Sequence, residues 1–265
     1  TNTDTKQYRK YQKKTSVAEF YEKNHKYQSY EYVQKIKSQV FPVGKWKYDI
    51  IKSIYLLDEI IDDSDPDNKR PQIYHALQTA EACRKANPDL DWFHLVGFIH
   101  DLGKILAHPN MHNLPQWAVV GDTFPVGCQF NKVNVFHEFF EENPDSKNDA
   151  YNTKFGIYSE ECGFDNMEFS FGHDEYLYQV CKSNECLLPE EALYIIRYHS
   201  FYPWHTNGGY EYFANKKDRE LKSLLKAFQK CDLYSKTSED VNLEELMPYY
   251  QGLIKKYFPN TMISW

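Results

Sequence analysis

A histidine, an aspartate and a lysine stand close together at the end of an otherwise apolar stretch, residues 93–104. They are His100, Asp101 and Lys104. On a helix, Lys104 follows His100 by four residues and Asp101 by three, so the three side chains can point into one pocket. Buried polar groups need partners, and a metal ion bound by His100 and Asp101 would supply one. Taken alone, however, a His-Asp pair favours a simpler interpretation, a core helix whose polar pair is satisfied by local hydrogen bonds.

Further histidines and one aspartate lie in segments that are predicted to be buried helices. These residues are His75, His173, His199 and Asp232. For each residue alone, hydrogen bonding within the core is the commoner explanation. Together with His100 and Asp101 they make six such residues on five predicted helices. Burying all of them without metal would require a fully satisfied polar network, which is costly if incomplete. The sequence therefore predicts a metal centre built from these six side chains.

The chemistry of these side chains narrows the choice of metal. Four imidazoles and two carboxylates, with no thiolate, disfavour a structural zinc site. They suit iron, manganese or catalytic zinc. Six ligands are too many for one ion that must also hold a substrate. If Asp101 bridges two ions, each ion has about three or four protein ligands and keeps open positions.

Composition excludes several classes of protein. The chain has 265 residues, of which 42% are hydrophobic and 17% aromatic, so a large folded core is expected. A formal charge of -7 argues against an extended nucleic-acid surface. The six cysteines show no CxxC pair, and no apolar run approaches the roughly 18 residues of a membrane span. We expect a soluble, reduced, cytoplasmic protein that binds neither nucleic acid nor membrane. It is expected to be a monomer because no segment resembles a coiled coil.

The elements that must position the six residues are helices. Apolar residues recur at helical spacing, and Pro or Gly ends most of the segments. The predicted helices span residues 16–38, 48–61, 72–86, 90–107, 172–183, 189–200, 217–235 and 242–257. A long irregular region at 108–170 contains one short run that resembles a strand, at 117–120. We predict one all-α domain over residues 1–265 with at most very short strands, in which residues 1–15 form an N-terminal arm.

Several motifs resemble those of one known family. The order His, His-Asp, Asp across helices is similar to that of the HD-domain superfamily of metal-dependent helical proteins. Within it, the motifs resemble those of the myo-inositol oxygenases. They are DDSDPD at 62–67, HA at 75–76, WFHLVG at 92–97, HDLGK at 100–104, PQWAVVGDTFPVGC at 115–128, GHDEY at 172–176, HSFYPWH at 199–205, DLY at 232–234 and PYYQGLI at 248–254. HDLGK alone also occurs in HD phosphodiesterases, whereas the whole set is specific.

The resemblance implies an HD-domain-like helical bundle with a defined activity and cofactor. The family converts myo-inositol and O2 to D-glucuronate, in inositol catabolism, at a mixed-valent Fe(II)/Fe(III) di-iron centre. By resemblance, one iron also holds substrate and is bound by His75, His100, Asp101 and Asp232. Asp101 bridges to a second iron, which His173 and His199 hold further. The implied substrate contacts are Arg9, Asp62, Asp63, Ser64, Lys104, Gly121, Asp122, His199 and Ser200.

The expected chemistry follows from Lewis-acid polarisation of the substrate. Two vicinal hydroxyls that chelate one iron would have a lowered pKa, and the ammonium of Lys104 would stabilise the resulting alkoxide. Asp101 and Lys104 are therefore the predicted catalytic residues.

Two alternatives remain open from the sequence. An HD-type metal-dependent phosphohydrolase would use the same ligands to activate water. Such an enzyme needs basic groups for phosphate, and Lys104 and Arg9 are the obvious ones, whereas Asp62, Asp63 and Asp122 would repel an anion. A binding protein that has only kept the fold is disfavoured because no ligand position is missing.

Overall fold

The computed structural model describes residues 16–60, 71–234 and 241–265. The predicted N-terminal arm at 1–15 lies outside these ranges. The α-helices are α1 (Ser16–Tyr27), α2 (Tyr30–Val40), α3 (Ile50–Leu57), α4 (Gln72–Ala86), α5 (Asp91–Ile99), α6 (His173–Ser183), α7 (Glu190–Tyr198), α8 (Tyr202–His205), α9 (Lys216–Tyr234) and α10 (Leu243–Tyr257). The strands are β1 (Lys47–Asp49) and β2 (Met262–Ser264), which pair antiparallel.

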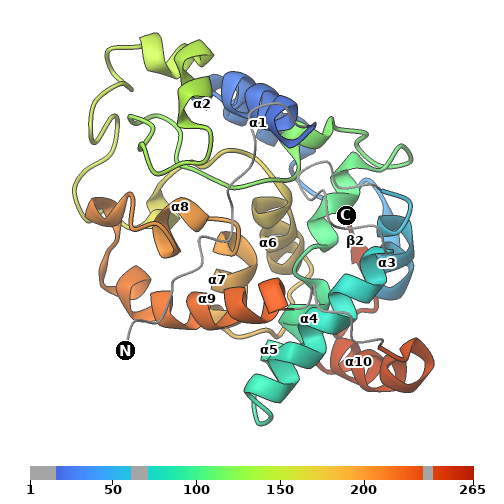
Figure 1. The fold of residues 1–265 in the computed structure, drawn as a ribbon. Helices are drawn as coiled ribbons and strands as arrows, with labels where there is room; N and C mark the ends of the chain where they lie inside the picture. The colour runs from blue at the N-terminus through green and yellow to red at the C-terminus, as the bar shows by residue number, and fades with distance from the viewer. Residues whose placement is uncertain (1–15, 61–70, 235–240) are drawn as a thin grey trace.

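The prediction of an all-α fold with very short strands is confirmed. The long irregular region is also found between α5 and α6, where the regular elements are short 3-10 helices. These are η1 (Leu102–Ala107), η2 (Gln116–Ala118), η3 (His137–Glu142), η4 (Pro144–Lys147) and η5 (Phe164–Asn166), and η6 (Glu211–Phe213) follows α8. In Figure 1 the blue helices α1 and α2 lie at the end of the molecule away from α9 and α10. The buried apolar side chains of all these parts form one continuous core.

Residues 117–120 do not form a strand, so that expectation is wrong. Ala118 donates its backbone N–H to the carbonyl of Pro115 at 2.9 Å, and Val119 donates to that of Gln116 at 2.9 Å, which makes a tight turn. Val119 and Val120 are buried in the core. The apolar run therefore serves packing, because a turn can bury β-branched side chains without strand pairing.

The predicted helix at 16–38 is interrupted and becomes α1 and α2. The Ser29 hydroxyl caps the start of α2 by accepting the Tyr32 N–H at 3.2 Å. Beside it, the amide of Gln28 donates to the carbonyl of Phe171 at 2.7 Å and accepts that residue's N–H at 3.0 Å. The break thus depends on a contact to a distant part of the chain.

Two glycines bring the neighbouring helices close to the His-Asp pair. On α5, Gly97 packs so tightly on α4 that an added Cβ would lie 2.7 Å from the Ala80 Cα. In η1, an added Cβ on Gly103 would overlap the carbonyl oxygen of His173 and lie 2.9 Å from its Cα. These close approaches place α4 and the first turn of α6 against the segment that carries His100 and Asp101. In the part of the chain that the structure describes, no helix is long and apolar enough to cross a membrane.

Candidate metal centre

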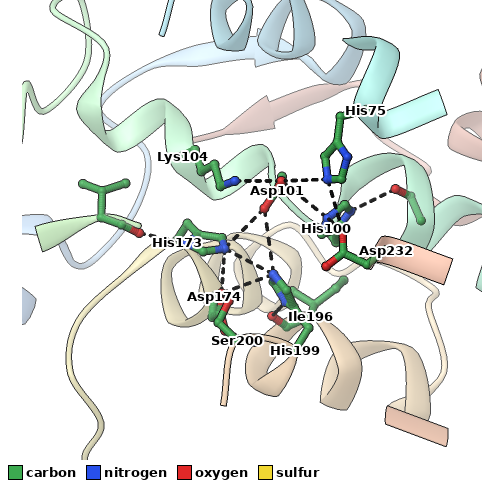
Figure 2. A network of polar contacts seen from close by, with 12 residues as sticks. His75, His100, Asp101, Lys104, His173, Asp174, Ile196, His199, Ser200 and Asp232 are labelled. Atoms are coloured by element: carbon green, nitrogen blue, oxygen red, sulfur yellow. Dashed lines mark hydrogen bonds and ion pairs between the residues drawn. The ribbon is translucent and has the colours of Figure 1, made fainter. Parts of the chain in front are cut away.

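The six predicted ligands converge at one point, although they come from five separate helical segments of the chain. Figure 2 shows them pointing toward one another from α4, the end of α5, α6, the end of α7 and α9. The predicted helix at 90–107 ends as an α-helix at Ile99, and η1 follows. His100 caps α5, and Asp101 precedes η1, so the change of helix type falls at the His-Asp pair. The prediction that Lys104 shares their pocket holds, since its Nζ lies 2.8 Å from Asp101 Oδ2.

The carboxylate of Asp101 divides the imidazoles into two groups. Its Oδ2 lies 3.6 Å from the Nε2 of His75 and 3.4 Å from that of His100. Its Oδ1 lies 3.4 Å from the Nε2 of His173 and 3.9 Å from that of His199. Each group is compact enough for its members to share one metal ion. One oxygen facing each group is the arrangement of a carboxylate that bridges two ions.

Asp232 of α9 completes the first group. Its Oδ1 lies 3.1 Å from His75 Nε2 and 3.5 Å from His100 Nε2. Burial by itself would raise the pKa of this carboxyl, but the hydrogen bonds and positive charge of the two imidazoles hold the pKa well below its usual range. Asp232 is therefore an anion in this site, which is the form that binds a metal ion.

Backbone carbonyls fix the tautomers of three of the histidines. The Nδ1 atoms of His100, His173 and His199 lie 2.9, 2.8 and 3.0 Å from the carbonyl oxygens of Gly97, Val119 and Ile196. A carbonyl oxygen only accepts, so each Nδ1 carries a proton and donates it. In the neutral ring the lone pair is then on Nε2, the atom that faces the centre of the site.

The nitrogen lone pairs of His173 and His199 favour a cation between the two rings. The Nε2 atoms of His173 and His199 lie only 3.2 Å apart, so two neutral rings would direct their lone pairs at each other. A positive charge between them removes this repulsion. Burial disfavours a charge on His173, yet the carboxylates of Asp174 and Asp101 raise the pKa of His173 to about 10. The same field that favours a proton here favours a metal ion, and imidazoles with carboxylates suit iron, manganese or catalytic zinc.

Comparisons with known proteins agree with this geometry. The family model for myo-inositol oxygenase matches residues 14–265. The chain belongs to the myo-inositol oxygenase family. It is 54% identical over 248 residues to the probable inositol oxygenase of Oryza sativa subsp. japonica, covering 94% of this chain and 80% of that protein. It is 52% identical to the inositol oxygenase of Dictyostelium discoideum (93% and 85% covered) and 50% identical to that of Danio rerio (92% and 87% covered).

One carboxylate of the site was missed by the sequence interpretation. Asp174 is buried, and its Oδ1 lies 2.8 Å from His173 Nε2 and 3.5 Å from His199 Nε2. Ser200 donates its N–H to Asp174 Oδ2 at 3.1 Å and its hydroxyl to Oδ1 at 3.0 Å. This contact brings Ser200, a predicted substrate contact, to the second group. The sequence did carry a signal, because Asp174 directly follows His173 in the first turn of α6, where a helix favours a carboxylate.

The predicted substrate contacts Gly121 and Asp122 lie in a loop next to the second group. Asp122 is buried, and its Oδ1 accepts the hydroxyl of Tyr21 of α1 at 3.0 Å. Thr123, the next residue, donates its backbone N–H to the carbonyl of Ser200 at 2.9 Å. The loop is therefore joined both to α1 and to the end of α7. Four further predicted contacts lie outside the residues that the structure describes: Arg9, Asp62, Asp63 and Ser64.

Replacing Gly103 by alanine is expected to disturb the centre. The added Cβ would overlap the backbone of His173, so η1 and α6 would have to separate and the two ligand groups with them. We expect the free energy of unfolding to fall by about 1–3 kcal/mol, as for other overpacked sites. The bound iron should fall as well. Denaturant unfolding of the metal-free protein and iron analysis of the loaded protein measure the two effects.

Gly252→Ala is the matched control for this substitution. Gly252 lies in α10, where an added Cβ has no atom within 4 Å. This change should stabilise the protein by about 0.5–1 kcal/mol, since alanine loses less conformational freedom than glycine in a helix. A Gly103→Ala protein with the stability and iron content of the parent would show that the close approach is not needed.

Proposed function

We propose that this protein is a di-iron enzyme that cleaves the ring of myo-inositol with O2 to give D-glucuronate, in inositol catabolism. Membership of the family supports the reaction. The observation that carries the di-iron part is the position of Asp101, one oxygen of which faces each group of imidazoles. When bound, two irons would supply Lewis acidity for the substrate hydroxyls and the electrons with which O2 reacts.

The proposed ligands follow the two groups. His75, His100 and Asp232 would hold, with Asp101, the iron that also takes the substrate. His173 and His199 would hold the second iron, with Asp101 as the bridge. Asp174 would keep the second group in place, because it contacts His173 and anchors the backbone of Ser200.

Lys104 is proposed to stabilise the negative charge that develops on a substrate oxygen. Its ammonium lies 2.8 Å from Asp101 Oδ2, on the side of His75. Its side chain is 13% exposed, so water screens the charge little. A substrate hydroxyl that loses its proton beside this ammonium would gain a charge-assisted hydrogen bond that the neutral alcohol lacks.

A polyol is uncharged, so it cannot form ion pairs and must be bound by several hydrogen bonds. Ser200 and Asp122 offer a hydroxyl and a carboxylate, and Gly121 offers its backbone beside them. Arg9, Asp62, Asp63 and Ser64 are proposed to add further contacts. The ring of Phe20 packs on Gly121, and Tyr21 bonds Asp122, so α1 covers this side of the site and excludes water from it.

The enzyme is proposed to be a single-domain monomer located in the cytoplasm. All six cysteines are thiols in the structure, as is usual in a reducing compartment. The relatives do not favour the alternative of an HD-type phosphohydrolase. Carboxylates such as Asp122 also suit a neutral substrate better than a phosphate.

An oxygen-uptake assay tests the proposed reaction. With myo-inositol, the iron-loaded protein should consume O2 and form glucuronate in equal amounts, and iron analysis should find about two irons per chain. Removal of iron by a chelator should abolish both signals, and adding iron back should restore them. Release of phosphate from nucleotides without O2 uptake would contradict the proposal in favour of the hydrolase. A protein that holds only zinc, or one iron, would contradict the di-iron centre.

A further inference from the structure

Helix α6 ends in a turn that brings two cysteines together. Cys186 donates its backbone N–H to the carbonyl of Cys181 at 3.1 Å, and Glu185 donates to that of Lys182 at 3.2 Å. Glu185 has a positive φ of 50°. This pair of bonds with a left-handed residue is the Schellman motif, which ends a helix by satisfying its last carbonyls. The structure places Cys181 three positions before the cap and Cys186 two positions after it.

The Schellman motif explains why the two cysteines lie close together. In this motif the side chains at these two positions pack on each other, usually as an apolar contact. Here both are cysteines, so the backbone bond from Cys186 to Cys181 brings the two side chains to the same place. Cys181 is fully buried in the core, whereas Cys186 is partly exposed between the exposed side chains of Glu185 and Leu187. Cys186 therefore lies nearer to solvent than Cys181.

We propose that Cys181 and Cys186 form a redox site, a dithiol that a hydroperoxide such as H2O2 oxidises to a disulfide. The site is separate from the metal centre, since the cysteines lie at the opposite end of α6 from His173. The inference does not rest on the proposed function.

Cys186 is the sulfur that attacks the peroxide. The hydrogen bond from the Cys181 thiol, opposed by burial but helped by the backbone at Leu188 and the charge of Lys182, lowers the pKa of Cys186 to about 7. More of Cys186 is therefore thiolate at neutral pH than of an ordinary cysteine, and thiolate is the reactive form. By contrast, the hydrogen bond to Cys186 and burial raise the pKa of Cys181 well above its usual value. An accessible low-pKa thiol beside a second thiol is the arrangement of a redox-sensitive cysteine pair.

The reaction balances with one peroxide. The Cys186 thiolate attacks one oxygen of H2O2, which breaks the O–O bond, gives a sulfenic acid and releases hydroxide that takes up a proton to become water. The Cys181 sulfur then attacks the sulfenic sulfur, the S–O bond breaks, and the leaving hydroxide takes the Cys181 proton as a second water. In sum, two thiols are oxidised to a disulfide, and one H2O2 is reduced to two waters.

The other cysteines lack one or other of these properties. Cys83 and Cys231 also influence each other's pKa, but both side chains are buried. Cys128 is buried as well, and burial raises its pKa. Cys162 is partly exposed, but burial of its thiol raises its pKa, so less of it is thiolate. Cys186 is thus the cysteine that combines exposure with a lowered pKa.

A disulfide would constrain the turn to which β2 and the end of α10 are hydrogen-bonded. Asn184, between the two cysteines, donates its side-chain amide to the carbonyl of Ser264 at 2.9 Å and accepts that residue's N–H at 2.8 Å. Leu187, the residue after Cys186, donates its N–H to the carbonyl of Tyr257 at 2.7 Å. Strand β2 and the end of α10 are thereby attached to the segment that the disulfide would close.

Peptide mapping tests the proposal directly, because Lys182 lies between the two cysteines. Trypsin cleaves after Lys182 and separates the peptides 155–182 and 183–197. The folded full chain would be treated with H2O2, its remaining thiols alkylated, and the tryptic digest analysed by mass spectrometry. We expect the two peptides to be linked and to separate after reduction with dithiothreitol. With Cys162 alkylated in both forms, the linked mass should lie about 2 Da below the sum of the two peptides with free Cys181 and Cys186 thiols.

Variants assign the link to the proposed pair. Peptide 155–182 also contains Cys162, so Cys162→Ser is the control that must keep the link. Cys186→Ser must abolish it. In Cys181→Ser, the sulfenic acid of Cys186 should persist and be trapped by dimedone. The proposal is overturned if the folded protein gives no linked peptides, if Cys186 proceeds to sulfinic acid without linking, or if the link disappears in Cys162→Ser.

Discussion

Replacing Asp101 by asparagine is expected to leave no more than about one iron per chain, against about two in the parent protein. Asparagine has the shape of aspartate, but one of its two oxygens becomes an NH2 group, which cannot bind a metal ion. Since each oxygen of Asp101 faces a different pair of imidazoles, one of the two groups loses its shared ligand. Iron analysis of the purified protein, loaded under the same conditions as the parent, measures this loss.

The same substitution is expected to lower oxygenase activity by more than about 100-fold. Residues that only orient metal ligands already contribute about 10–100-fold, and Asp101 is proposed as a direct ligand of both irons. The matched control is Asp89→Asn, a change at an exposed aspartate before α5, which should keep both iron and activity. An Asp101→Asn protein that holds two irons and turns over normally would refute the bridging role.

The ligands could be predicted from the sequence because their signal is local. An imidazole or carboxylate within an apolar helical segment is costly to bury, and this cost is visible without the fold. His75, His173 and His199 are each ambiguous alone, and their number decides the interpretation. The structure confirms that these side chains meet at Asp101. That they bind iron remains a prediction, which the iron analysis above tests.

Several features of the fold could not be predicted because they depend on distant contacts. The end of α1 is fixed by Gln28, whose partner Phe171 is 143 residues away in the sequence. No residue near Gln28 in the sequence indicates that Phe171 is its partner. The run at 117–120 has the composition of a strand, but η2 already bonds its own backbone within the turn. In both places, tertiary context overrides local propensity.

Asp174 shows the corresponding limit for the site. The sequence places it beside His173, but neighbours on a helix point in different directions, about 100° apart. Both residues reach the site because they begin α6. His173 is its first residue, and the side chain of Asp174 contacts Ser200 just after α7. Its bonds to Ser200 cross 26 residues. The sequence therefore shows a carboxylate next to His173 but does not show that it contacts Ser200.

Lys104→Met is expected to retain both irons and to lower kcat with myo-inositol by about 100–1,000-fold, the usual effect of removing one group that stabilises transition-state charge. Methionine keeps most of the length and apolar contact of lysine but has no charge and no N–H donor. The side chains that form the two ligand groups remain unchanged, so metal binding should persist. The substrate oxygen would then develop its negative charge without the ammonium beside it. Steady-state kinetics and iron analysis of the same preparation measure both quantities.

The two measurements together distinguish two roles for Lys104. If Lys104 acts on the substrate, kcat falls while the iron content stays at the value of the parent. If its only role is to hold Asp101, to which its Nζ is bonded at 2.8 Å, removing it frees that carboxylate and iron is lost together with activity. Lys85→Met, at an exposed position near the end of α4, controls for the loss of a positive charge as such and should behave like the parent. A fall in kcat with iron retained would support the proposed contact with the substrate alkoxide. Loss of iron together with activity in Lys104→Met would contradict it.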